Sequence, residues 1–157
     1  SNVIARLDQP GSTSTILLDA HMDTVPTDGM IIDPFDPVEK DGGVYGRGSC
    51  DMKGGMAAVL SALVRLKEQK PEGAANVIVT CTCDEEATVL GVTDLAKLWT
   101  DHVRAGSLIS EPPDVAIMPE TTDLDIVVAH RGATRWKIKT SGQACHSSRP
   151  EEGNKAI

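Results

Sequence analysis

Acidic side chains and one histidine follow three apolar runs of this sequence, each at the point where the run ends. They are, in chain order, His21 and Asp23, then Asp84, Glu85 and Glu86, then Glu120. The runs themselves, residues 15–18, 77–83 and 115–118, are apolar without alternation, which predicts strands buried on both faces. If these strands are parallel, their carboxyl ends meet at one edge of a sheet, where open α/β sheets bind ligands.

Carboxylates gathered in a partly dry cleft repel one another, so a positive charge is needed to hold them together. Few lysines or arginines stand near these positions, and a divalent metal ion is the simplest source of that charge. One imidazole with several carboxylates and no evident thiolate suits zinc, cobalt or manganese better than calcium, which favours oxygen ligands alone. The sequence therefore predicts a metal centre at this edge of the sheet.

A further acid, Asp51, lies in a glycine-rich segment at residues 46–55. Glycines allow the backbone to pass close to a bound group, which makes Asp51 a candidate ligand. The segment lacks the Gly-Lys-Ser/Thr ending of a phosphate-binding loop and follows a predicted hairpin, so nucleotide binding is not expected.

Taken singly, each of these residues also has an ordinary structural explanation. These are a polar loop for His21 and Asp23, a helix N-cap for Asp51, loop charge for Glu85 and Glu86, and a turn for Glu120. His102 and His130 are expected in packing or structural roles. The joint pattern is more specific than any of its members, and it favours the metal centre.

The elements that must position these residues alternate along the chain. The sequence predicts strands at the three apolar runs and at residues 3–7, a hairpin at residues 38–45, and helices at residues 56–66 and 93–104. Alternating strands and helices predict an α/β fold with a mostly parallel central sheet flanked by helices.

The character of the sequence changes after residue 129. Residues 135–139 alternate polar and apolar, as in a sheet with one solvated face. We therefore expect a partial catalytic domain in residues 1–129 and the beginning of an α+β lid or dimerisation domain in residues 130–157. A strand-like stretch opens the sequence at once, and residues 151–157 resemble the first turn of a helix, so part of a longer protein is expected.

The net charge and the cysteine spacing indicate which binding partners are disfavoured and in which compartment the protein is expected. The net charge of −8 and the pI near 4.9 disfavour nucleic acid and anionic membranes as partners. No stretch approaches the roughly 20 apolar residues of a membrane span, and no signal-peptide pattern opens the sequence. The four cysteines lack C-x-x-C spacing, so buried free thiols in a reducing compartment, the cytoplasm, are expected.

Three motifs together resemble the signatures of a zinc metallopeptidase family. They are Leu-Asp-Ala-His-Met-Asp-Thr-Val-Pro at residues 18–26, Gly-Arg-Gly-Ser-Cys-Asp-Met-Lys-Gly-Gly at residues 46–55, and Asp-Glu-Glu at residues 84–86. The family includes acetylornithine deacetylase, succinyl-diaminopimelate desuccinylase, aminoacylase-1 and the bacterial glutamate carboxypeptidases. Motif order and approximate spacing agree over nearly the whole chain, although residues 118–121 depart from the usual Gly-Glu-Pro-Thr-like run.

The resemblance implies a role for each matching residue. His21 and Glu120 resemble ligands of a first metal ion, Glu86 a ligand of a second, Asp51 the bridging carboxylate, Glu85 the general base, and Asp23 the acid that orients His21. His146 would match a histidine of the lid domain that reaches the partner subunit's active site and polarises the substrate carbonyl. The family's second metal ion also takes a histidine near the C-terminus, which neither His102, His130 nor His146 matches.

The resemblance thereby implies a reaction. Two divalent metal ions, zinc by expectation with cobalt or manganese as alternatives, would activate a bridging water, and Glu85 would take its proton. The substrate would be an N-acyl amino acid or a small peptide, cleaved at an amide bond, and the full-length protein would be a homodimer. This chain alone is expected to be inactive, and a catalytically incomplete relative with a binding or dimerisation role is the alternative.

Overall fold

The computed structural model describes residues 1–100, 109–129, 131–132, 134, 136–143, 145–146 and 148–154. The chain divides into two compact units, Ser1–Asp125 and Ile126–Ile157. The first unit contains β1 (Val3–Leu7), β2 (Thr15–His21), β3 (Val38–Lys40), β4 (Gly43–Tyr45), the π-helical turn η1 (Ser49–Gly54), α1 (Gly55–Gln69), β5 (Asn76–Thr82), α2 (Leu90–Thr100) and β6 (Val115–Ile117). The second unit contains the short helix η3 (Pro150–Glu152).

A four-stranded sheet with the order β1-β5-β2-β6 forms the centre of the first unit. β2 pairs in parallel with both β5 and β6, and β1 is antiparallel to β5. The prediction of a mostly parallel sheet flanked by helices is confirmed. Because β2, β5 and β6 run in the same direction, their carboxyl ends lie at one edge of the sheet.

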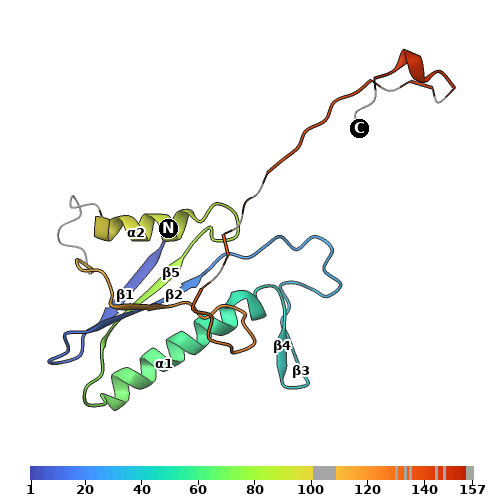
Figure 1. The fold of residues 1–157 in the computed structure, drawn as a ribbon. Helices are drawn as coiled ribbons and strands as arrows, with labels where there is room; N and C mark the ends of the chain where they lie inside the picture. Colours follow the sequence, from blue (N-terminus) through green and yellow to red (C-terminus); the bar gives the residue numbers. More distant parts are fainter. Residues whose placement is uncertain are drawn as a thin grey trace. The chain divides into compact units, whose positions relative to one another are not determined.

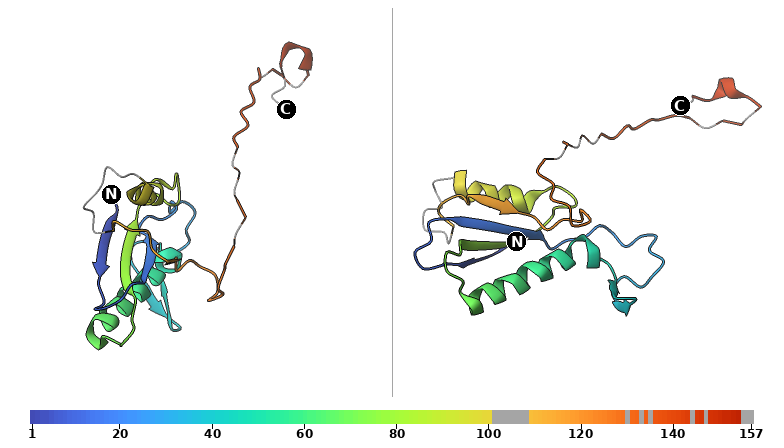
Figure 2. Two further views of the ribbon diagram at one scale, coloured as in Figure 1. Left: turned by 60° about the vertical axis from the view of Figure 1, so that its left-hand side comes forward. Right: turned by 60° about the horizontal axis from the view of Figure 1, so that its bottom comes forward.

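Helices α1 and α2 cover opposite faces of this sheet (Figures 1 and 2). In β5, Ile78 packs in the cluster on the α2 side, whereas Val77 and Val79 pack in the cluster on the α1 side. A strand covered on both faces buries successive side chains on both sides, which explains the apolar residues 77–79 of β5. β5 therefore holds the two layers of the core together.

The two long helices differ from their predicted bounds. α1 extends on both sides of residues 56–66, and among its apolar residues Val59 is buried while Leu60 and Val64 are exposed. α2 begins at Leu90, three residues before the predicted start, and residues 101–108 lie outside the described part of the chain.

Two strand predictions need correction. β6 was expected to be buried on both faces, but Val115 and Ile117 are half exposed, because β6 is the last strand of the described sheet and pairs with β2 alone. Residues 136–139 form no strand. A strand requires a hydrogen-bonded neighbour, and the described residues of the second unit pair only at Gln143 and Asn154.

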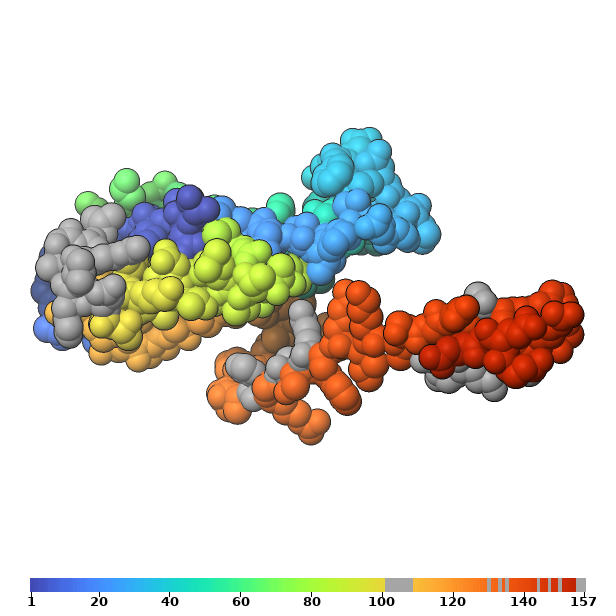
Figure 3. All heavy atoms as spheres, turned by 90° about the horizontal axis from the view of Figure 1, so that it is seen from above, coloured from blue at the N-terminus to red at the C-terminus, as the bar shows by residue number. Residues whose placement is uncertain are grey.

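The predicted hairpin is present in β3 and β4, with Asp41 and Gly42 at positive φ in its turn. In Figure 3 the light-blue to cyan stretch that contains it stands out from the rest of the first unit. None of the described helices has the length and apolar character needed to cross a membrane.

All four cysteines are free, as the spacing predicted. The expectation that they are buried is wrong for Cys50 and Cys145, which are exposed, while Cys81 and Cys83 are partly buried. The difference arises because Cys50 lies in a surface turn and Cys145 lies outside any helix or strand.

Candidate metal centre

His21 is the last residue of β2, and its side chain is only 3% exposed. Its Nδ1 lies 2.9 Å from the backbone carbonyl oxygen of Asp23. Because a carbonyl oxygen only accepts, the neutral imidazole carries its hydrogen on Nδ1 and presents a lone pair on Nε2. Nε2 lies 3.1 Å from Oδ1 of Asp51 and 3.9 Å from Oε1 of Glu120. The free nitrogen of His21 thus faces two carboxylates.

The electrostatics at this position favour an added positive charge. Burial opposes the imidazolium form of His21, but the carbonyl of Asp23 and the carboxylates of Glu120, Glu85 and Asp51 outweigh it and raise the pKa of His21. Burial also raises the pKa of Glu120, and the neighbouring carboxylates add to that shift. In the metal-free protein a proton on His21 supplies this positive charge. A bound metal ion would replace that proton.

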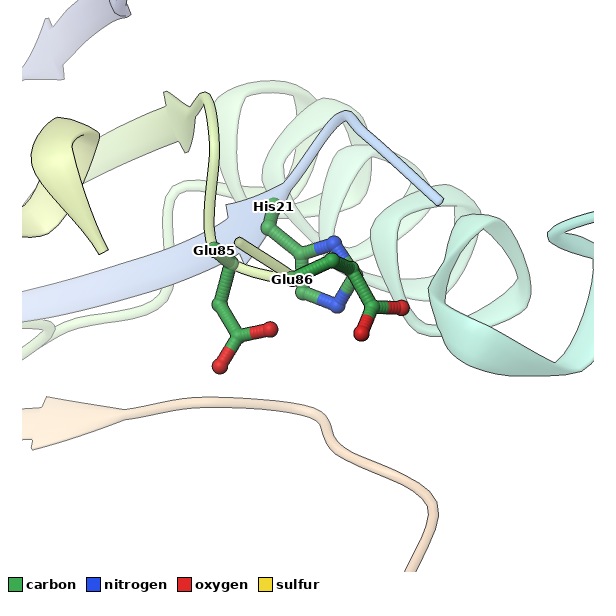
Figure 4. Close-up of side chains that lie close together, drawn as sticks. All are labelled: His21, Glu85 and Glu86. Carbon is green, nitrogen blue, oxygen red and sulfur yellow. The ribbon is translucent and has the colours of Figure 1, made fainter. Parts of the chain in front are cut away.

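Glu85 and Glu86 lie in the loop that follows β5, and Asp23 holds the backbone of this loop. Its Oδ1 accepts the N–H of Glu85 and its Oδ2 accepts the N–H of Glu86, both at 3.1 Å. Burial acts to raise the pKa of Asp23, but these two N–H groups outweigh it and lower that pKa. In Figure 4 both glutamate carboxylates and the imidazole of His21 extend to the same side of the sheet edge.

The contact of Asp23 with His21 differs from the one expected. The Asp23 Oδ1 lies 3.8 Å from Nδ1 of His21, which is beyond hydrogen-bond distance, whereas the backbone carbonyl of Asp23 meets that nitrogen at 2.9 Å. Asp23 therefore orients His21 with its backbone and supports the glutamate loop with its carboxylate.

Asp51 lies in η1, the turn that joins the hairpin to α1. Its peptide bond to Met52 is cis. α1 begins at Gly55 with Gly54 at the N-cap position, so Asp51 is not the cap of this helix. Met52 is fully buried, and its sulfur lies 3.1 Å from the backbone nitrogen of His21. The buried Met52 side chain thereby anchors Asp51 beside the end of β2.

Glu120 follows Pro119 in the segment after β6. A Cβ atom on Gly55 would lie 2.4 Å from the carbonyl oxygen of Pro119, so only glycine lets the first turn of α1 approach this segment. The side chains of Asp51 and Glu120 are 51% and 42% exposed, which leaves both carboxylates open to a ligand.

The donor atoms at this edge suit a divalent metal ion. Two overlapping sets, His21 with Glu85 and Glu86, and His21 with Asp51 and Glu120, each have their donor atoms within 4.8 Å of one another. Ligands bound to zinc at about 2.0–2.2 Å stand at most about 4.4 Å apart, so small side-chain movements suffice. Nitrogen and carboxylate donors in this mixture also accept cobalt or manganese. The residues present therefore fit such an ion.

The structure does not test the roles expected of the other three histidines. His146 belongs to the second unit, where its Nδ1 accepts the backbone N–H of Ser148 at 3.3 Å. His102 and His130 lie outside the described residues. The role predicted for His146 stays a prediction.

Asp19 is a buried acid that the sequence analysis did not single out. Its Oδ1 accepts the hydroxyl of Thr80 at 2.5 Å, and its Oδ2 accepts that of Thr82 at 3.2 Å. Burial raises the pKa of Asp19, and the two hydroxyls and His21 oppose that shift. These bonds tie β2 to β5 two residues before His21. The available signal was the pair of threonines in an otherwise apolar strand.

A mostly parallel α/β sheet with one imidazole and several carboxylates at its carboxyl edge is typical of metal-dependent hydrolases. The sequence matches the family "Peptidase family M20/M25/M40" over residues 17–148. The chain belongs to this family, as the resemblance indicated.

Named relatives agree with this assignment. The chain is 38% identical over 162 residues to a probable succinyl-diaminopimelate desuccinylase of Staphylococcus aureus (strain MRSA252), covering 100% of the chain and 37% of the relative. It is 37% identical over 144 residues to an acetylornithine deacetylase of Pasteurella multocida (strain Pm70), covering 90% of the chain and 35% of the relative. The chain therefore spans little more than a third of these relatives.

Solved structures have the same fold. An M20 family metallo-carboxypeptidase from Sulfolobus solfataricus matches with a TM-score of 0.61 and 25% identity, over 75% of this chain and 25% of that one. A tripeptidase from Staphylococcus aureus matches in fold with a TM-score of 0.58 and 21% identity, over 99% of this chain and 39% of that one.

Proposed function

We propose that this chain carries most of the active site of a hydrolase that uses two divalent metal ions to cleave an amide bond. The observation that carries the proposal is the convergence of donors from four separate segments, namely His21, Asp51, Glu85 with Glu86, and Glu120. Similarity to a probable desuccinylase and to a deacetylase supports an N-acyl amino acid or a small peptide as substrate.

The contacts of His21 with Asp51 and Glu120 support a shared first ion. His21 and Glu120 would hold this ion, and the family resemblance assigns Glu86 to the second ion and Asp51, with its exposed side chain, to both. Bound there, the ions would lower the pKa of a water molecule and polarise the amide carbonyl. Zinc is the ion expected, with cobalt or manganese as alternatives.

Glu85 would act as the general base. It is exposed, it neighbours the ligand Glu86, and the bond from its N–H to Asp23 fixes its backbone. From this position its carboxylate would take a proton from the attacking water and later deliver it to the leaving amine.

The remaining parts of the proposal concern the complete protein. A further ligand of the second ion would come from a region outside this chain, and His146 of the second unit would polarise the substrate carbonyl in a partner subunit of a homodimer. A cytoplasmic location accords with the four free cysteines.

The test is a hydrolysis assay of the complete, metal-stripped protein with N-acyl amino acids and dipeptides before and after zinc is restored. Zinc should restore activity, and Glu85→Gln should lower kcat by roughly 10²–10⁴-fold while the protein retains both ions. Glu72→Gln, which alters an exposed glutamate between α1 and β5, is the matched control and should behave like the unmodified protein.

Two results would contradict the proposal. Glu85→Gln with near-normal kcat would exclude Glu85 as the base, and full activity in metal-stripped protein would exclude the metal mechanism. A complete protein that binds zinc but hydrolyses none of these substrates would support the incomplete relative instead.

A further inference from the structure

The side-chain amide of Asn2 bridges the two ends of the loop that carries Glu85 and Glu86. Its Oδ1 accepts the backbone N–H of Cys83 at 3.2 Å, and its Nδ2 donates to the backbone carbonyl of Gly91 at 2.8 Å. The two ends of the loop are also hydrogen-bonded to each other, since the N–H of Gly91 donates to the carbonyl of Cys83 at 3.0 Å. Three hydrogen bonds thus close the base of this loop, and Asn2 makes two of them.

The topology of the sheet brings Asn2 to this position. β1 is antiparallel to β5, with Val3 opposite Cys81, so the start of β1 lies at the carboxyl end of β5. A residue 81 positions away in sequence from Cys83 therefore reaches the loop that leaves β5. No local sequence signal connects the two segments.

The packing at Gly91 shows how closely the parts fit. A Cβ atom there would lie 2.2 Å from the carbonyl oxygen of Cys83 and 2.8 Å from Oδ1 of Asn2. Only glycine leaves room for the carboxamide between the two backbones. The carboxamide of Asn2 supplies the acceptor and the donor on two separate atoms, as this arrangement requires.

We propose that Asn2 is a positioning residue of the metal centre, because its carboxamide closes residues 83–91 into a loop that holds Glu85 and Glu86 toward His21. The inference rests on the proposed function for the roles of the two glutamates. Asp23 holds the middle of this loop through the N–H groups of Glu85 and Glu86, and Asn2 holds its two ends. With both supports present, the carboxylates are presented without a loop rearrangement when an ion binds.

The test uses the complete protein with three variants. Asn2→Ala removes both bonds, and Asn2→Asp keeps the size and the acceptor but loses the donor to Gly91. Asn76→Ala is the matched control, because the buried carboxamide of Asn76 makes the same kind of bridge at the opposite end of β5. Its Oδ1 accepts the N–H of Gln9 at 2.8 Å, and its Nδ2 donates to the carbonyl of Ser12 at 3.4 Å.

For each variant we would measure Tm, zinc affinity by competition with a chelator, and kcat and KM separately. Both Asn2 variants should bind zinc about tenfold more weakly and lose about tenfold in kcat at saturating zinc, with KM within twofold, since losing a partner that orients metal ligands typically costs tenfold or more in metal affinity or activity. Asn76→Ala should lower Tm at least as much while zinc affinity and kcat stay within twofold.

Two outcomes would overturn the inference. Unchanged zinc affinity and kcat in both Asn2 variants would show that Asn2 does not act on the metal centre. Equal losses in Asn2→Ala and Asn76→Ala at equal Tm would reduce its role to general stability. Failure of the proposed function would appear differently, as an inactive unmodified protein, and the zinc titrations would then still decide the role of Asn2.

Discussion

Replacing Asp23 by asparagine tests how the metal centre is held in place. In the structure the two oxygens of Asp23 accept the N–H groups of Glu85 and Glu86, both at 3.1 Å. Asparagine keeps one acceptor and turns an NH₂ group toward the other N–H, so one charge-assisted bond is lost and a donor faces a donor. The size of the side chain does not change.

The expected fall in kcat/KM follows from the strength of these two hydrogen bonds. A hydrogen bond to a charged group contributes about 1.5–3 kcal/mol, and the 28% exposure of the Asp23 side chain places the loss near the lower value through solvent screening. A loss of about 1.5–2 kcal/mol corresponds to a roughly 10–30-fold fall in kcat/KM. We expect this fall to appear mainly in kcat, because Glu85 is the proposed base.

The assay is steady-state hydrolysis by the complete protein at saturating zinc, together with metal analysis. Asp114→Asn is the matched control, since Asp114 Oδ2 accepts the backbone N–H of Thr15 at 2.7 Å at the opposite end of the sheet. Near-normal kcat/KM for Asp23→Asn, or an equal loss for Asp114→Asn, would refute the argument. Selective loss of the ion at His21, with normal catalysis once zinc is restored, would instead assign Asp23 to orienting the imidazole.

Three further predictions concern the ligands and their supports. Asp51→Ala should lose both ions together, and metal analysis that still finds two would contradict the bridging role. Because the pKa of His21 is raised, its imidazolium stabilises the metal-free fold fully below about pH 6.5 and progressively less as pH rises through the raised value. Zinc affinity should therefore increase with pH across that window, and a chelator-competition titration giving a flat profile would refute this coupling. Gly55→Ala should lower Tm and weaken zinc binding, because the added Cβ would clash with Pro119 beside Glu120. An unchanged Tm in thermal unfolding and an unchanged zinc affinity would contradict the close approach of Gly55 to Pro119.

Much of the fold and the composition of the candidate centre followed from local patterns. Continuous apolar runs indicated strands covered on both faces, and β5 with its two core clusters is such a strand. Because parallel strands share one carboxyl edge, the acids and the histidine at the ends of the three runs were expected to lie together. Nε2 of His21 does lie 3.9 Å from Oε1 of Glu120. The family was also evident from the motifs.

Other features depended on neighbours that no local pattern specifies. The exposure of Val115 and Ile117 in β6 depends on what pairs with and covers that strand, which its own apolar sequence does not reveal. Asp51 fitted an N-cap equally well until the start of α1 at Gly55 was known.

The sequence by itself therefore indicated that His21, the Glu85–Glu86 pair and Glu120 gather at the sheet edge, because residue type and strand direction suffice for groups that follow strands. Only the tertiary structure decided how they are held: the carboxylate of Asp23 on the glutamate loop, and Asn2 across its ends. The physical reason is that a hydrogen bond forms only within a few tenths of an ångström of its preferred length. Segments 62 to 89 residues apart meet with that precision only once the whole sheet is packed.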